Sequence, residues 1–170
     1  PMVVTALEGD ASITIDALAK ATDADADNVL SVINLGALPQ GVSYDATSHQ
    51  FTLDPTNSAF NALSVGEVMN LIVNYDVTDG SASVTTSAKF TITGTNDAPI
   101  VSAAVTAAGT EGGAAISVAA LANATDVDAH DTLSIVYDAA TLPAGVSYNA
   151  VTKSFVLDPT NAAYLALNTG

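Results

Sequence analysis

The sequence predicts an all-β chain made of two tandem antiparallel β-sandwich domains, the second of which stops before its last two strands. Three observations carry this prediction. The chain repeats itself at an interval of about one hundred residues, apolar and polar residues alternate in short segments, and turn-forming residues separate those segments. Such an interval is too long for a solenoid repeat and suits a whole small domain.

The two copies can be aligned residue by residue. Residues 51–57 (FTLDPTN) return as 155–161 (FVLDPTN), and residues 38–44 (LPQGVSY) return as 142–148 (LPAGVSY). These matches lie 104 residues apart, whereas Glu8 matches its counterpart at 103, so the second copy carries one inserted residue between the two parts. The close match predicts that both copies share one fold.

The copies differ in how far they extend. The first continues beyond Gly66 to Pro99, whereas the second ends at Gly170, which is the counterpart of Gly66. We therefore assign residues 1–98 to the first domain and residues 99–170 to a second, incomplete copy of it. The missing part corresponds to the last two strands of the first copy.

Alternation predicts the individual strands in chain order. In the first copy we expect them at residues 12–15, 30–34, 42–44, 50–53, 68–77 and 84–93. The matching segments of the second copy are residues 116–118, 133–137, 146–148 and 154–157. In residues 68–77 one face is apolar, formed by Met69, Leu71, Val73, Tyr75 and Val77. This pattern is typical of a strand that is buried on one side.

A helical turn is expected once in each copy. Asp54 and Pro55, like Asp158 and Pro159, suit the N-cap and the first position of a helix, and residues 59–63 could continue it. The remaining helix content should be small. The segment that joins the copies, residues 94–99, ends in a proline that favours an extended connection.

Composition limits the partners. The chain has 18 acidic residues against 3 Lys and Arg together, a net charge of −15, and 49% hydrophobic residues. It should fold despite its charge, but it lacks the basic clusters that bind nucleic acid or anionic lipid. The absence of Cys excludes disulfides, zinc thiolate sites and thiol nucleophiles. No apolar run approaches a membrane span, so we expect no direct membrane insertion. No Sec-type signal is present at the start of the sequence.

Acidic residues cluster in the loops that follow the first strands. Asp23, Asp25 and Asp27 occupy alternate positions, and the second copy has Asp126, Asp128 and Asp131 with His130 between the last two. Like charges so close together are unfavourable unless they share a cation, and carboxylates favour a hard ion such as calcium. The alternative is a solvated acidic turn, because runs of charge are usually exposed.

Several of these segments together resemble a known family. Residues 23–25 (DAD), 75–80 (YDVTDG) and 94–99 (GTNDAP), with the stretch from Asp54 to Leu63, are similar to bacterial cadherin-like repeats, also called VCBS repeats. These repeats are extender modules of giant RTX-type adhesins, and the resemblance covers nearly the whole chain. It implies Ig-like (cadherin-like) β-sandwich domains in a secreted protein at a bacterial cell surface, of the kind that supports cell adhesion and biofilm.

The resemblance also implies a set of calcium ligands at the junction between consecutive domains. They would be a Glu from the first strand of the upper domain, linker Asn and Asp, and an Asp-x-Asp of the lower domain. In this sequence these positions are Glu8, Asn96, Asp97, Asp126 and Asp128. A later Asp of the lower domain, matching Asp79, would fall beyond Gly170.

The first copy should hold a second, weaker site. It has Asp23, Asp25 and Asp79, but the linker that would complete the site precedes Pro1. Water would replace the linker oxygens and lower the affinity. Glu111, the counterpart of Glu8, would serve a further junction.

The residues do not favour an enzyme. His49 and His130 do not share a repeat position, no Gly-x-Ser-x-Gly turn occurs, and the chain has no Trp and few aromatic residues to line a sugar cleft. Acids that recur at equivalent loop positions favour repeated ion sites over one active site. We therefore expect no catalytic residue and no cofactor other than Ca²⁺.

Two functions follow from these expectations. The first is a calcium-stiffened extender whose partners are neighbouring repeats of the same chain. The alternative is an adhesion module that binds a glycan or protein ligand directly. Because the second copy would expose sheet edges and core residues such as Leu133, Tyr148 and Phe155, a strand-exchanged homo-oligomer is a further possible assembly.

Overall fold

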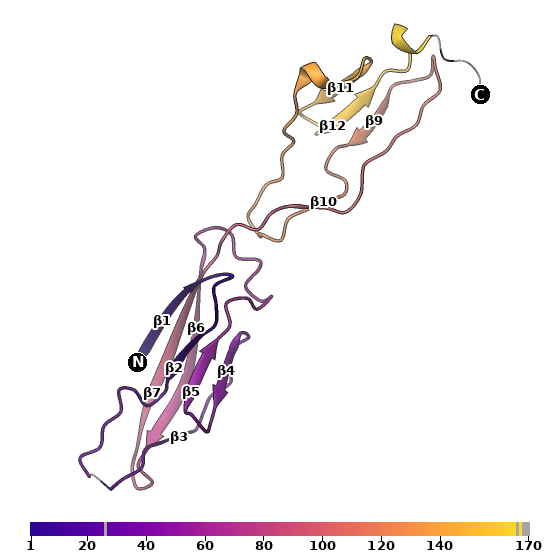
Figure 1. Cartoon of the computed structure of the whole chain (residues 1–170). Coiled ribbons are helices and arrows are strands. Elements are labelled where there is room, and N and C mark those ends of the chain that lie inside the picture. Colours follow the sequence, from indigo (N-terminus) through magenta and orange to yellow (C-terminus); the bar gives the residue numbers. More distant parts are fainter. Residues whose placement is uncertain (26, 166, 168–170) are drawn as a thin grey trace. The chain divides into compact units, whose positions relative to one another are not determined.

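The computed structural model describes residues 1–25, 27–165 and 167, and its regular structure is β-strand with two short 3₁₀ turns (Figure 1). The chain divides into two compact units. Unit 1 comprises Pro1–Asp97 with Val127–His130, and unit 2 comprises Ala98–Asp126 with Asp131–Gly170. The all-β class is confirmed. In the described part of the chain, no helix is long and apolar enough to cross a membrane.

The larger sheet of unit 1 has four strands in the order β1-β7-β6-β3 (Figure 1). They are β1 (Met2–Leu7), β3 (Ser31–Ile33), β6 (Val68–Thr78) and β7 (Ser83–Thr93). β1 runs parallel to β7, whereas β6 pairs antiparallel with both β7 and β3. The long β6–β7 hairpin therefore supplies the hydrogen-bond partners of both edge strands.

The second sheet of unit 1 has three antiparallel strands in the order β2-β5-β4. They are β2 (Ile13–Asp16), β4 (Val42–Asp45) and β5 (Gln50–Leu53). Phe51, on the central strand, pairs in register with Ile15 on one side and Tyr44 on the other.

One hydrophobic core lies between these two sheets. Phe51 and Leu53 from β5 are fully buried, as are Val73, Phe90 and Ile92 from the β6–β7 hairpin. Along β6 the buried or half-buried side chains alternate with exposed ones, which confirms the predicted apolar face. Two sheets that share one core are consistent with a β-sandwich.

The strand β1 was not among those expected from the sequence. Met2, Val4 and Ala6 are buried, while Val3 and Leu7 on the other face are half or more exposed. Because apolar residues occupy both faces, the alternation that marks a half-buried strand is hidden in the sequence.

The helical turn predicted after Asp54 is wrong for the first copy. The Asp54 carboxylate accepts hydrogen bonds from the Thr56 backbone N–H (3.1 Å) and hydroxyl (2.7 Å), which makes a local turn instead of capping a helix. The backbone then makes separate turns, in which the N–H of Asn57, Phe60 and Leu63 each bonds to the carbonyl three residues earlier. This three-residue spacing directs Phe60 and Leu63 into the core.

In the second copy the same region forms one 3₁₀ turn, Ala162–Tyr164 (η2). Its cap is Asn161, whose side chain accepts from the Ala163 N–H at 3.0 Å. Asp158, the predicted cap, instead accepts from the hydroxyl and N–H of Thr160. The predicted position of the cap was therefore wrong by three residues.

Unit 2 contains a three-stranded sheet in the order β11-β12-β9 and a short two-stranded one. The three strands are β9 (Ile116–Ala119), β11 (Val146–Asn149) and β12 (Ser154–Leu157). The short sheet pairs β8 (Ile100–Val101) with β10 (Ala124–Thr125). A second 3₁₀ turn, Ala139–Thr141 (η1), is capped by Asp138, whose side chain accepts from the Ala140 N–H.

The strand predicted at residues 133–137 is absent, although those residues are fully described. Its counterpart in unit 1 contains β3, which is paired with β6. The described part of unit 2 has no counterpart of β6, so this segment has no neighbouring strand to complete a ladder.

Candidate metal centre

Glu8 follows directly after β1, at the end of the larger sheet of unit 1. Its backbone N–H donates to the Thr93 carbonyl at 2.9 Å, which continues the pairing between β1 and β7. Its Oε2 accepts a hydrogen bond from the Thr95 N–H at 3.2 Å. The sheet therefore holds Glu8 beside the segment that follows β7.

The loop Val127–His130 packs on the same end of unit 1. The Ala129 N–H donates to the Ala62 carbonyl at 3.2 Å, and the His130 N–H donates to the Ser64 hydroxyl at 3.0 Å. These bonds carry Asp128 into a buried position, where its side chain is 4% exposed. The Asp97 N–H then donates to Asp128 Oδ2 at 2.8 Å.

Three acidic side chains thus influence one another in unit 1. Burial raises the pKa of Glu8 above its ordinary value, the hydrogen bond from Thr95 opposes that change, and the charges of Asp97 and Asp128 raise the pKa further. The repulsion means that Glu8 interacts unfavourably with its acidic neighbours when it is ionised. A cation at this position would reverse the sign of the interaction.

Asp126, Asp128 and Asp131 form the group best suited to hold an ion. Each offers one carboxylate oxygen, and these oxygens lie within 4.8 Å of one another. The three residues belong to one short segment, and their exposure ranges from buried Asp128 to exposed Asp131. An all-oxygen set fits a hard cation such as Ca²⁺ or Mg²⁺ better than a soft one.

Of the ligands that the resemblance implies, Asp126 and Asp128 belong to this group of carboxylates, and Glu8 and Asp97 lie next to Asp128. One further residue, Asp131, joins the group, and one implied ligand, Asn96, is an exception. Asp131 was not in the implied ligand set, although the acidic run already contained it. Asn96 was in that set, but its side-chain amide donates to the Asp97 carbonyl. Its amide oxygen is the atom that could still serve as a ligand.

The acidic residues predicted to bind an ion in the first copy, Asp23, Asp25 and Asp79, are only partly brought together in the structure. Asp23 Oδ1 accepts from the Asp25 N–H at 2.8 Å, and Asp79 Oδ1 accepts from the N–H groups of Ala82 (2.6 Å) and Ser81 (2.7 Å). Those backbone bonds lower the pKa of Asp79, and the Asp23 side chain contributes in the same direction. Within the described residues, a group of three acids spaced for one metal ion is found at 126–131, not here.

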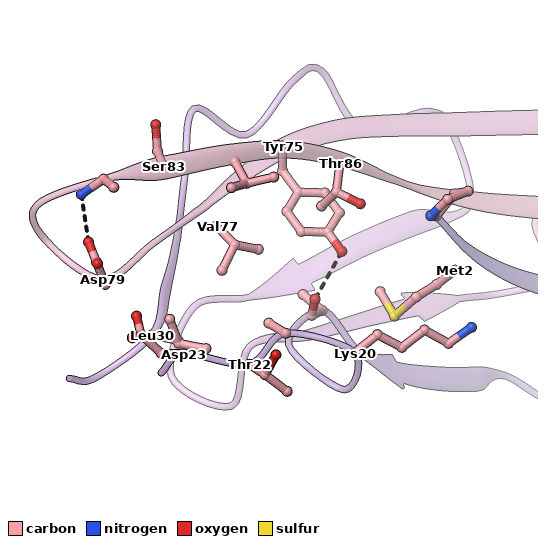
Figure 2. Close-up of a pocket in the computed structure, with 15 residues that line it drawn as sticks. Met2, Lys20, Thr22, Asp23, Leu30, Tyr75, Val77, Asp79, Ser83 and Thr86 are labelled. Carbon is pink, nitrogen blue, oxygen red and sulfur yellow. Dashed lines mark hydrogen bonds between the residues drawn. The ribbon is translucent and has the colours of Figure 1, made fainter. Parts of the chain in front are cut away.

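Asp23 and Asp79 lie at one end of a cavity of about 330 Å³ in unit 1 (Figure 2). Tyr75 crosses its middle, and its hydroxyl donates to the Ala17 carbonyl at 2.9 Å. Lys20 and Met2 line the opposite end. Local sequence patterns could not indicate this cavity, because its walls come from segments far apart in the chain.

Glu111 occupies the position in unit 2 that Glu8 occupies in unit 1. The Gly112 N–H donates to the Pro159 carbonyl at 3.0 Å, as the Gly9 N–H donates to the Pro55 carbonyl at 3.1 Å. Glu111 is exposed and is not part of the three-carboxylate group.

A Ser–His–Glu cluster that the sequence did not indicate lies near the buried Asp128. His130 Nδ1 is 3.3 Å from the Ser64 hydroxyl and 3.3 Å from Glu67 Oε2. Hydroxyl and carboxylate approach the same ring nitrogen, whereas a nucleophile relay uses the two nitrogens on opposite sides of the ring. The geometry fastens the loop to unit 1 and does not activate the serine.

Comparison with known proteins adds little to this description. No family model matches the chain, and no curated protein matches it. Among solved structures, the chain is similar to an endo-fucoidan hydrolase, MfFcnA4, of glycoside hydrolase family 107, with 16% sequence identity and a TM-score of 0.37. That match covers 92% of this chain and 22% of the hydrolase chain, so this chain spans about a fifth of its length. A likeness this weak supports no argument about function.

Proposed function

We propose that this chain is a calcium-binding segment of tandem Ig-like repeats, of the cadherin-like (VCBS) type, that acts as a stiff extender in a large adhesin at a bacterial cell surface. The observation that supports the calcium part is the group of Asp126, Asp128 and Asp131, whose carboxylate oxygens lie within 4.8 Å of one another. The adhesin part rests on the sequence resemblance.

Charge explains how an ion would act. Ca²⁺ takes six to eight oxygen ligands, more than the three carboxylates offer with one oxygen each. Bidentate carboxylates, water, and oxygens of Glu8 or the linker would complete the shell. The ion would turn the repulsion among Glu8, Asp97 and Asp128 into attraction, and so hold residues 126–131 in one conformation.

Calorimetric titration tests the calcium proposal. We expect saturable Ca²⁺ binding by the wild-type chain, and binding at least tenfold weaker in Asp128→Asn, because a buried carboxylate contributes both charge and a fixed ligand position. Asp45→Asn is the matched control. Asp45 is an exposed acid at the end of β4, and its Oδ1 accepts a hydrogen bond from the Thr47 N–H. Equal affinity in wild type and Asp128→Asn would exclude this site.

Small-angle scattering tests the extender proposal. We expect the particles in solution to have a narrower distribution of maximum dimensions in Ca²⁺ than in EDTA. A scattering profile that does not change, together with an unchanged melting temperature, would overturn the stiffening role even if an ion binds.

The alternative, direct binding of a ligand, is favoured by one observation. The cavity in Figure 2 has about the volume of a small-ligand site and is lined by Met2, Tyr75 and Val77 together with polar groups. A glycan array probed in Ca²⁺, with Tyr75→Phe as a shape-preserving variant, would reveal such binding. An array without signal would leave the extender function as the better account.

A further inference from the structure

A loop that belongs to the second copy in the sequence is part of unit 1 in the structure. The loop, Val127–His130, is flanked in the chain by segments of unit 2, yet its contacts group it with Pro1–Asp97. A segment stays in such a position only if its contacts offset the conformational entropy that it loses. The contacts of this loop therefore decide whether it is ordered.

Two backbone hydrogen bonds attach the loop to residues 62–67 of unit 1. The Ala129 N–H donates to the Ala62 carbonyl at 3.2 Å, and the His130 N–H donates to the Ser64 hydroxyl at 3.0 Å. The His130 ring approaches the same hydroxyl, with Nδ1 3.3 Å from its oxygen. Both partners in each contact are protein groups, so none of these contacts requires an ion.

Residues 62–67 form a rigid support for the loop. The Ser64 N–H donates to Glu67 Oε2 at 3.2 Å, and the Glu67 N–H donates to the Ser64 carbonyl at 2.9 Å. The Gly66 N–H bonds to the Gly94 carbonyl at 3.0 Å, and the Gly94 N–H bonds to the Glu67 carbonyl at 2.8 Å. A Cβ on Gly94 would lie 2.5 Å from the Ser64 carbonyl oxygen, so the two segments pack backbone against backbone. The support is thus fixed between the start of β6 and the end of β7.

Ser64 is the side chain that joins this support to the loop. The residue is 8% exposed, and a buried hydroxyl needs a hydrogen-bond partner. In the part of the chain that the structure describes, both hydroxyl contacts are with His130. A hydroxyl can accept from a backbone N–H and still donate its own hydrogen, because it has two lone pairs and one O–H.

We propose that Ser64 is the positioning residue of a latch, formed by residues 62–67 and the loop Val127–His130, that holds the loop on unit 1 when no ion is bound. The latch places Asp128, the residue before Ala129, where its Oδ2 accepts from the Asp97 N–H at 2.8 Å. This carboxylate is then in position before any cation arrives. The latch itself does not depend on calcium.

A bound ion and the latch act on the same loop, and this part of the inference rests on the proposed calcium function. A ligand that binds only the seated loop stabilises that state by the factor 1 + [L]/Kd. At about a hundredfold excess over Kd, the ion lowers the unseated population about a hundredfold. Loss of one hydrogen bond raises that population only about fivefold, so Ca²⁺ should compensate for a weakened latch.

Site-resolved amide hydrogen exchange of the full chain in EDTA tests the latch. We expect the Ala129 and His130 amides to be protected in the wild type, and to exchange about fivefold faster in Ser64→Ala. Ala129 is the decisive amide, because it bonds to Ala62 and responds only if the whole loop leaves its support. Ser64→Thr keeps the hydroxyl and should retain the protection.

The matched control is Ser43→Ala, at an exposed serine of β4, which should change neither amide. The amides of β6 and β7 should exchange as in the wild type in every variant, which shows that unit 1 remains folded. In saturating Ca²⁺, both loop amides of Ser64→Ala should return to slow exchange.

Three outcomes would overturn the latch. Wild-type loop amides that exchange in EDTA as fast as in an unstructured chain would show that the loop is not seated without an ion. Equal rates in Ser64→Ala and Ser43→Ala would remove the role of Ser64. A faster His130 amide with an unchanged Ala129 amide would reduce Ser64 to a local contact. Protection in EDTA that Ca²⁺ does not increase would support the latch and contradict the calcium function.

Discussion

At the scale of single residues, both copies have glycine at a position where the backbone conformation and a neighbouring ring permit no other residue. Gly41 and Gly145 adopt φ of 75° and 77°, and a Cβ at either would lie 2.6 to 2.7 Å from the aromatic ring of Phe60 or Tyr164. Left-handed backbone and a ring in contact both require glycine. A tight turn against an aromatic side chain is therefore the same in both units.

Gly41→Ala should destabilise unit 1 more than Gly66→Ala does. Both glycines have φ near 80°, so each alanine costs about 1–2 kcal/mol in backbone strain. Only at Gly41 does the new methyl meet a ring, at 2.6 Å from Phe60, which adds about 1–3 kcal/mol of overpacking. Urea unfolding measures both changes. Equal losses of stability would show that Phe60 moves aside freely.

Glu8→Gln should make the ion-free chain less sensitive to pH. The raised pKa of Glu8 means that the folded state holds its proton more tightly than the unfolded state, so stability falls as pH rises from the ordinary Glu value to the raised one. Gln removes this fall and can still accept the Thr95 bond. Melting temperatures from pH 3 to 8 in EDTA are the measurement. Glu111→Gln, at the equivalent position, is the control, and a stability difference between wild type and Glu8→Gln that does not change with pH would contradict the prediction.

At the scale of elements, the β6–β7 hairpin determines how completely each unit folds. It buries the apolar face of the β4-β5-β2 sheet and pairs with both β1 and β3. Where the described residues contain no such hairpin, as in unit 2, the three-stranded sheet still forms but its face is half-exposed. Turns and pairing between neighbouring strands are therefore sufficient to form the three-stranded sheet, whereas the hairpin is needed to bury its apolar face in a core.

Phe51→Ala and Phe155→Ala should therefore differ, although they are the same substitution at the same place in the repeat. Phe51 is 0% exposed, and its loss should cost about 3–5 kcal/mol of unit 1 stability. Phe155 is half-buried, so its loss should cost clearly less. Hydrogen exchange of β5 and β12 amides reports each unit separately. Equal costs would mean that the face of unit 2 is covered in solution.

At the scale of the whole molecule, the net charge of −15 should make stability depend on salt in two distinct ways. Monovalent salt screens repulsion gradually and without saturation. A calcium site instead adds about 2.7 kcal/mol at a hundredfold excess over Kd, and then saturates along a binding curve.

Melting curves should separate these effects. In EDTA, we expect a gradual rise of melting temperature with NaCl. At fixed ionic strength, CaCl₂ should raise it further along a saturating curve, and Asp128→Asn should lose that second effect while it keeps the first. A response to CaCl₂ equal to that of NaCl at the same ionic strength would indicate screening alone.

The sequence by itself determined the duplication, the all-β class, most strands and the acidic run at 126–131, because repeats, alternation and charge spacing are local properties. It misplaced the helical turn, since Asp54 bonds to Thr56 two residues away before any helix begins. Only the tertiary structure decided that residues 133–137 stay unpaired, and that Asp128 is buried beside Asp97. Both outcomes depend on residues far away in the chain. A strand needs a neighbouring strand to pair with, and a buried carboxylate needs a hydrogen-bond donor, and neither partner can be recognised from local sequence.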